Sequence, residues 1–362
     1  MHSISITSLL RTYLADPYAP GWCMAMVISK EGSSYRSPGA IMFINPDGQA
    51  SGMVSGGCLE ADVMRRSRQV LIDKTPRYLE YDMIDDESFA AELGIGCRGK
   101  IGVFVQSLTE ECHQMLTLFL HELKLGRKCY LQQHYNSAKE SQTSRMVLMD
   151  STQRPIATIG DDFQLQQFSN EHQHEFEREG DLCWSMTRFQ PAIHLAVFGG
   201  GGDARPLVAM ASILGWKISL IDQRPAYANR RFFPLADALI KKAPSSLARE
   251  SLEIDAAVVM THNMKLDADW VQWLFAAEQL PEYIGLLGPY ERKQRVLELL
   301  PELDRARLER HLRGPVGMDL GGELPESIAL AILADMHAVL NHGTGLQLAG
   351  LNKSSLSQVN LS

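Results

Sequence analysis

The sequence predicts an α/β protein in which an N-terminal mixed α+β domain precedes a Rossmann-like, doubly wound parallel sheet. From residue 192 onward, apolar strand-like runs alternate with helical patterns, and the first of these runs ends in Gly199-Gly200-Gly201-Gly202. Before residue 110, short apolar runs follow one another with polar turns between them, which is typical of paired strands. The length of 362 residues allows two domains or three small ones.

Composition and charge exclude several classes of protein. Hydrophobic residues make up 45% and charged residues 22%, which is ordinary for a globular chain. The net charge of −8 gives no overall positive field, so neither nucleic acid nor an anionic membrane surface is expected as a partner. The six cysteines form no CxxC pair, which argues against a zinc ribbon or a disulfide-rich secreted scaffold. Charged residues interrupt the longest apolar stretches, so we expect no membrane span and a cytoplasmic location.

Within residues 1–109, short strands should precede the first long helix. Pro46 and Gly48 predict a hairpin turn, since Pro fixes one φ and Gly accepts a positive φ. Beyond Ser55-Gly56-Gly57-Cys58 the apolar residues recur with helical spacing, so Cys58 should lie at a strand-to-helix junction. The expected elements are an N-terminal helix, strands at 23–29, 40–44, 50–54, 78–83 and 100–108, and helices at 59–71 and 87–93.

Residues 110–190 carry a weaker pattern and are expected to form a connecting α+β segment. The polar stretch 164–180 is rich in Gln, Glu and His and predicts a solvated helix or loop. The expected elements are a helix at 110–125 and strands at 129–134, 145–149 and 183–188. The Rossmann-like domain should occupy residues 191–345, and residues 346–362 should form a flexible tail.

Gly199, Gly201 and Ala204 match the pattern GxGxxG/A directly after a strand and at the start of a helix. Glycines let the backbone turn tightly and approach a phosphate, while the helix N-terminus supplies N–H groups. Asp222 ends the next strand, close to the spacing of about 20 residues expected for a ribose-binding acid. Asp203 would place a carboxylate beside a pyrophosphate, so either it points away or the ligand differs from NAD. A tight turn without a ligand is the alternative for the whole loop.

The loop after the fourth strand of this sheet should lie beside the glycine loop, because ligands of open parallel sheets bind where the strand order reverses. His262 lies in that loop and is a candidate for acid-base or hydrogen-bonding work. An exposed or capping histidine is the alternative.

Two arginines are candidate anion ligands. Arg36, in the polar turn 31–39, suits bidentate binding of an anion, although it could equally cap the turn. Arg292, near the start of the helix after the fifth strand, suits a phosphate. A solvated amphipathic face explains the basic residues around Arg292 equally well.

Cys58 and Cys97 are the candidate reactive thiols. Cys58 opens a helix, whose N-terminus lowers the pKa of a thiol, and Glu60 lies in the first turn, where a carboxylate suits the helix dipole. Cys97 lies in a glycine-rich loop next to Arg98. A small buried side chain is the alternative for both cysteines. The remaining cysteines are expected to be inert: Cys23, Cys112, Cys129 and Cys183.

Seven segments, taken in this order, closely resemble the xanthine dehydrogenase accessory factor family of XdhC/CoxI type. They are EGSSYRSPGAIMF, SGMVSGGCLE, the glycine loop around Cys97, the strand and glycine loop that end in IDQRP, VVMTHNMKLD, YIGLLGPYERKQR and RGPVGMDLGGELPESIALAILADM. The resemblance spans nearly the whole chain except residues 110–190 and the tail after Asn341.

The resemblance implies a role in the maturation of molybdenum hydroxylases. Family members bind molybdenum cofactor (molybdopterin, with its cytosine dinucleotide form as an option), assist its sulfuration with a cysteine desulfurase, and insert it into the apoenzyme. By position it implies these site residues: Gly57, Cys58, Glu60 and Cys97 in the first domain, and Gly199, Gly201, Asp222, Arg224 and His262 in the second. The sequence departs from the family at two places. The family's glycine loop often reads Gly-Ala-Gly-His, whereas Gly202 and Asp203 occupy the histidine region here. The family's second cysteine is often followed by two glycines, whereas Arg98 follows Cys97.

Three functions stay open at this point. In the first, a maturation chaperone rather than a turnover enzyme, soft thiolates hold the molybdenum end of the cofactor and the glycine loop holds its phosphate or nucleotide end. In the second, an NAD(P)-dependent oxidoreductase uses the same glycine loop and Asp222. In the third, a nucleotide-sensing regulator performs no chemistry. A homodimer is an option for each of them.

Overall fold

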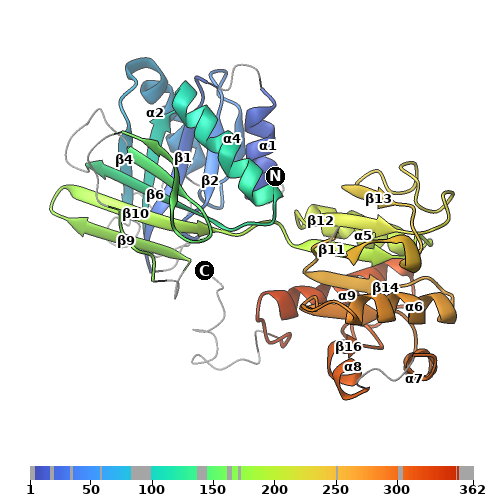
Figure 1. Ribbon diagram of the computed structural model, residues 1–362. Coiled ribbons are helices and arrows are strands. Elements are labelled where there is room, and N and C mark those ends of the chain that lie inside the picture. The colour runs from blue at the N-terminus through green and yellow to red at the C-terminus, as the bar shows by residue number, and fades with distance from the viewer. Residues whose placement is uncertain are drawn as a thin grey trace. The chain divides into compact units, whose positions relative to one another are not determined.

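The computed structural model describes residues 5–16, 20–32, 36–57, 59–82, 99–136, 145–160, 165–169, 173–249, 252–300, 305–347 and 349. They fall into two compact units whose boundary lies between Ala192 and Ile193. The N-terminal unit is built on antiparallel sheets and the C-terminal unit on a parallel sheet (Figure 1). The predicted fold class is therefore confirmed.

The first sheet of the N-terminal unit has the strand order β3-β2-β1-β5-β4, with antiparallel neighbours. Its central strand is buried from Cys23 to Ile28. Met24, Met26 and Ile28 join one apolar cluster while the alternate residues join another, so both faces of the strand are covered. The strands are β1 (Cys23–Gly32), β2 (Ile41–Ile44), β3 (Ala50–Gly52), β4 (Arg77–Asp82) and β5 (Gly99–Ser107).

Helix α2 (Glu60–Asp73) packs against one face of this sheet through Val63 and Val70. The other face joins a cluster that also draws side chains from helices α1 (Ile6–Leu14) and α4 (Glu110–Lys124) and from a second antiparallel sheet. The two sheets and two helices of the N-terminal unit therefore share one core. The short helix expected at 87–93 lies outside the described residues.

The second sheet has the order β8-β7-β6-β10-β9. Its strands are β6 (Cys129–Asn136), β7 (Arg145–Met149), β8 (Pro155–Ile159), β9 (His174–Glu179) and β10 (Leu182–Phe189). The prediction of a solvated helix or loop over 164–180 is wrong where β9 lies. An edge strand needs few apolar residues, because pairing with β10 supplies its backbone hydrogen bonds and its outer side can stay polar.

The parallel sheet of the C-terminal unit has the order β13-β12-β11-β14-β15-β16. Its strands are β11 (His194–Phe198), β12 (Lys217–Ile221), β13 (Ala238–Ile240), β14 (Ala256–Val259), β15 (Tyr283–Leu286) and β16 (Leu312–Arg313). The chain begins at the centre of the sheet, runs outward to β13 and returns to β14. The strand order therefore reverses between β11 and β14, where ligands of such sheets bind.

Helices cover both faces of this parallel sheet. α5 (Ala204–Ile213) and α9 (Pro325–Leu340) pack in one apolar cluster, and α6 (Met264–Phe275), α7 (Tyr290–Glu298) and α8 (Arg305–His311) pack in the other. Burial on both faces explains why the strands read as continuous apolar runs. Within the described part of the chain, no helix has the length and apolar character needed to cross a membrane.

Candidate functional site

The turn between β3 and α2 is closed on itself by a serine and a glutamate. The Glu60 carboxylate accepts hydrogen bonds from the backbone N of Ser55 at 2.8 Å and from its Oγ at 2.5 Å. The same Oγ accepts from the backbone N of Gly57 at 3.2 Å and of Leu59 at 3.1 Å. Cys58 belongs to this turn by sequence but lies outside the described residues, as does Cys97. Glu60 therefore holds the shape of the turn that carries Cys58.

The sequence reading missed Ser55. A serine three residues before a glutamate signals a capping box, but here the turn places Glu60 five residues after Ser55. Gly57 adopts a φ of +116°, a backbone conformation that favours glycine. Extra residues in the turn thus hide the capping signal from any search at the usual spacing.

Arg36 lies beside the segment that leads into this turn. Its Nη2 is 3.9 Å from Sδ of Met53, and Met53 precedes Ser55 by two residues. Both side chains line a small pocket of about 100 Å³. Ligand sites usually hold about 300 Å³ or more, so this pocket is too small for a pterin. The role of Arg36 as an anion ligand stays a prediction.

The cysteines expected to be inert are buried: Cys23, Cys112, Cys129 and Cys183. Burial raises the pKa of the Cys23 thiol and of the Cys129 thiol to about 12. Both therefore stay protonated at neutral pH, and a thiol is a much weaker nucleophile and metal ligand than a thiolate. All four therefore lie in the interior, and their inertness stays a prediction.

The glycine loop between β11 and α5 closely approaches the loop after β14. Gly199 adopts a φ of +119°, and a Cβ atom there would lie 2.5 Å from the carbonyl oxygen of Met260. A Cβ atom on Gly201 would lie 3.3 Å from Nε2 of His262. The loops after the first and fourth strands are therefore neighbours, as the topology predicted.

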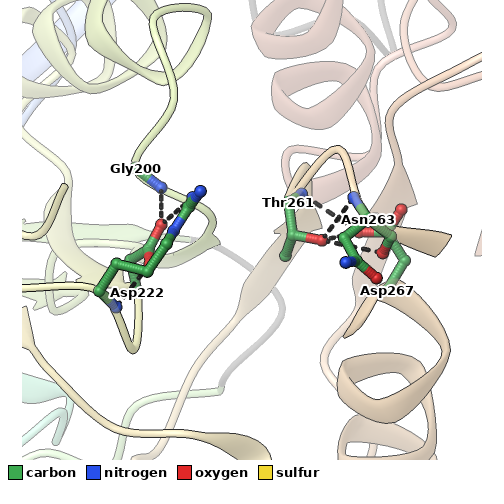
Figure 2. A network of polar contacts seen from close by, with 6 residues as sticks. Gly200, Asp222, Thr261, Asn263 and Asp267 are labelled. Carbon is green, nitrogen blue, oxygen red and sulfur yellow. Dashed lines mark hydrogen bonds and ion pairs between the residues drawn. The ribbon is translucent and has the colours of Figure 1, made fainter. Parts of the chain in front are cut away.

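Asp222 ties the glycine loop to the end of β12 (Figure 2). Its Oδ2 accepts from the backbone N of Gly200 at 2.9 Å and from Nη2 of Arg224 at 2.7 Å. Its Oδ1 accepts from the backbone N of Arg224 at 2.9 Å and from Nε at 3.0 Å. A carboxylate offers about four lone-pair sites, so these bonds leave little capacity for a ribose hydroxyl. Ribose binding by Asp222 stays a prediction, and the contacts give it a loop-holding task.

The charge of Asp222 is stabilised in the folded chain. Burial by itself raises the pKa of this carboxyl, but the hydrogen bonds from Arg224 and from the backbone of Gly200 outweigh it and hold the pKa below its ordinary value. The Arg224 guanidinium also lies 3.7 Å from the ring centroid of Tyr227. Arg224 is therefore held on two sides while its side chain stays 44% exposed.

Asp222→Ala is expected to lower the free energy of unfolding by about 1.5–3 kcal/mol at pH 7, because it removes charge-assisted hydrogen bonds. Because the pKa of Asp222 is lower in the folded than in the unfolded chain, the ionised carboxylate stabilises the fold above about pH 4. This stabilisation is lost as the pH falls through the folded pKa. Denaturant titrations of parent and variant should therefore converge below pH 4. Arg224→Ala combined with Asp222→Ala should cost less than the sum of the single losses. Strict additivity would contradict the shared network.

His262 faces Asp203 across the gap between the two loops. Its Nε2 lies 3.3 Å from Oδ2 of Asp203, and the side chains are 56% and 31% exposed. His262 adopts a φ of +59°, which is uncommon for a residue other than glycine. The Asp203 carboxylate therefore points toward His262, and the acid-base role of His262 stays a prediction.

A second buried carboxylate, Asp267 in the first turns of α6, holds the loop after β14 (Figure 2). Its Oδ1 accepts from the backbone N of Thr261 at 3.1 Å and from Thr261 Oγ1 at 2.5 Å. Its Oδ2 accepts from Nε of Arg292 at 3.0 Å and from Nη2 at 2.5 Å. Arg292 is thus bound to a carboxylate that is fully buried. Its proposed phosphate contact stays a prediction, and sequence reasoning missed Asp267.

Comparisons with known proteins identify relatives of both units. The model of the XdhC and CoxI family matches residues 21–82, and that of the XdhC Rossmann domain matches residues 195–336. A probable xanthine dehydrogenase subunit from Bacillus subtilis (strain 168) is 30% identical over 329 residues, covering 86% of this chain and 91% of that protein. The molybdenum cofactor insertion chaperone PaoD from Escherichia coli (strain K12) is 24% identical over 328 residues, covering 89% and 84%.

A crystal structure shows the same fold. It is described as a xanthine dehydrogenase from Bacillus halodurans, and it matches with a TM-score of 0.77 at 28% sequence identity. The match covers 98% of this chain and 100% of that one. The two chains therefore share this fold.

Proposed function

The chain belongs to the XdhC and CoxI family, and we propose that it binds molybdenum cofactor and delivers it to the apoenzyme of a molybdenum hydroxylase. The similarity to a molybdenum cofactor insertion chaperone supports the delivery role. The similarity to a probable xanthine dehydrogenase subunit supports a molybdenum hydroxylase as the client. In this proposal the cofactor is a cargo that the chain takes up and releases.

The observation that carries the proposal is the closed turn Ser55–Glu60. Hydrogen bonds within the chain, from Ser55 to Glu60 and from Leu59 to Ser55, hold this turn. A preformed turn reduces the ordering cost of binding. Cys58 precedes α2 by two residues in the sequence, and a thiolate near a helix N-terminus is stabilised. Thiolate is a suitable ligand for a soft metal-sulfur group.

The finer steps of the proposal concern sulfur. Cys58 and Cys97 would hold or shield the molybdenum end of the cargo while a cysteine desulfurase supplies the terminal sulfur. Glu60 acts on this step through the turn, as a positioning residue, because both oxygens of its carboxylate bind Ser55. Glu60→Gln should therefore weaken cargo retention less than loss of the thiol does.

Cys58→Ala is expected to lower the molybdenum retained by the full-length chain at least about tenfold, because the soft ligand is lost while the Ser55–Glu60 contacts remain. The measurement is metal content and released pterin fluorescence after anoxic purification from cells that make the cofactor. Cys183→Ala is the matched control, since that thiol is buried in β10, and it should retain parental metal.

Unchanged retention in Cys58→Ala, Cys97→Ala and their combination would contradict the thiol site. Transfer is tested separately, by adding loaded chain to molybdenum hydroxylase apoenzyme and following the appearance of its activity. Absence of bound pterin together with substrate-dependent oxidation of NADH would instead support the NAD(P)-dependent alternative.

A further inference from the structure

An open pocket of about 560 Å³ lies at the carboxyl ends of the parallel strands. Its wall comes from the residue after Asp222, from the turn after β13 and from the first three turns of α6. None of the site residues predicted from the sequence is among the described residues that line it. Its volume falls in the range of about 300–1,000 Å³ that small-molecule sites occupy.

Part of the pocket lining is apolar. Trp273 donates a hydrogen bond from Nε1 to the carbonyl oxygen of Leu247 at 2.9 Å, which fixes the plane of its indole. Leu266, Ala243 and Pro244 complete the apolar lining. Trp273 is only 8% exposed, so an aromatic ring in the pocket would contact its edge together with these apolar neighbours.

The rim of the pocket carries polar groups with unused hydrogen-bonding capacity. Within the part of the chain that the structure describes, the side chains of four lining residues make no hydrogen bond or ion pair: Gln223, Lys265, Asp269 and Gln272. Amide side chains both donate and accept, which matches the mixed edge of a nucleobase. Lys265 and Arg249 bring positive charge to the lining and Asp269 brings negative charge, so the pocket offers both signs to the polar edge of a base.

The pocket lies next to the glycine loop on two sides. Gln223 directly follows Asp222, whose carboxylate accepts from the backbone N of Gly200 at 2.9 Å. Asn263 directly follows His262, which faces Asp203 of the glycine loop. The glycine loop leads into the N-terminus of α5, where backbone N–H groups favour an anion. Phosphates at this loop would therefore lie within reach of a base in the pocket.

We infer that this pocket binds the base of a nucleoside diphosphate whose phosphates lie on the glycine loop. Where the diphosphate belongs to a nucleotide form of molybdenum cofactor, the inference rests on the proposed function and extends it to the nucleotide end of the cargo. A nicotinamide dinucleotide has the same diphosphate chemistry, and the choice of probe separates the two sources.

The test titrates CDP, ADP and NADH into the full-length chain by calorimetry. Gln223→Ala and Gln272→Ala should each weaken the nucleotide that binds the parent by about 2- to 12-fold, the range expected for one hydrogen bond. Both residues are exposed, and among the described residues their side chains make no hydrogen bond or ion pair. Gln279→Ala is the matched control, since this exposed glutamine lies beyond α6 and does not line the pocket. It should bind like the parent.

Preference for CDP over ADP and NADH would support a nucleotide form of the cofactor as the ligand, and the reverse order would support a nicotinamide dinucleotide. The inference is overturned if no nucleotide binds at millimolar concentration, if pyrophosphate alone binds as tightly as CDP, or if the pocket variants bind like the parent. Retention of molybdenum by the same preparations reports separately on the proposed function. If molybdenum is retained but no nucleotide binds, the pocket inference fails and the proposed function stands. If nucleotide binds but no molybdenum is retained, the proposed function fails.

Discussion

Asp267→Ala is expected to lower the free energy of unfolding of the C-terminal unit by about 3–5 kcal/mol, because removing one partner of a buried ion pair leaves the other charge uncompensated. Asp267 is fully buried, and its loss would leave the Arg292 guanidinium without its carboxylate partner and the backbone N–H of Thr261 without its acceptor. Trp270 and Trp273 on the same helix report the unfolding of this region. Denaturant titration followed by tryptophan fluorescence measures the loss.

Asp269→Ala is the matched control for this prediction. Asp269 lies on the same helix and has no hydrogen bond or ion pair among the described residues, so its loss should change stability by no more than about 0.5 kcal/mol. Asp267→Leu with Arg292→Met removes both charges and should recover much of the stability. A loss below about 1 kcal/mol in Asp267→Ala would contradict the importance of this ion pair.

Gly199→Ala should destabilise the C-terminal unit by about 2–4 kcal/mol, through backbone strain and a steric clash. The φ of +119° is one that alanine rarely adopts, and the new Cβ would lie 2.5 Å from the carbonyl oxygen of Met260. Relief of this contact requires the glycine loop and the loop after β14 to move apart. Denaturant titration should show the loss, and calorimetry with CDP or ADP should show weaker binding.

Gly202→Ala separates local strain from a general intolerance of the glycine loop. A Cβ atom on Gly202 meets nothing within 4 Å, and its φ is not positive. This variant should keep parental stability to within about 0.5 kcal/mol. Equal losses in the two variants would contradict the assignment of the constraint to Gly199.

The sequence by itself determined the C-terminal architecture. The four central parallel strands, β11, β12, β14 and β15, are buried on both faces, and such strands are continuous apolar runs in the sequence. The helices between them show the helical period. The glycine loop could be located for the same local reason, since a φ of +119° at Gly199 leaves glycine as the residue that fits. Because β11 and β14 are neighbours in the sheet, the loops that follow them lie side by side. The position of His262 beside the glycine loop could therefore be predicted from the strand order.

The sequence also indicated the turn that carries Cys58, but not the residue that closes it. Glycines mark a turn wherever they occur, whereas the bond between Ser55 and Glu60 depends on how the intervening residues fold. Strand β9 was missed for a related reason. Its side chains are largely polar, and pairing with β10 decides its conformation.

Only the tertiary structure decided which charges are neutralised and which stay available to a ligand. Asp222 and Arg292 both matched patterns for ligand binding, yet each directs its hydrogen bonds to the protein, to Gly200 and Arg224 in one case and to Asp267 in the other. A charged side chain interacts with whatever the fold brings within a few ångströms, and Arg292 is 25 positions from Asp267 in the sequence. The pocket at Gln223 and Gln272 was hidden likewise, because its walls come from separate segments that meet only where the strands end.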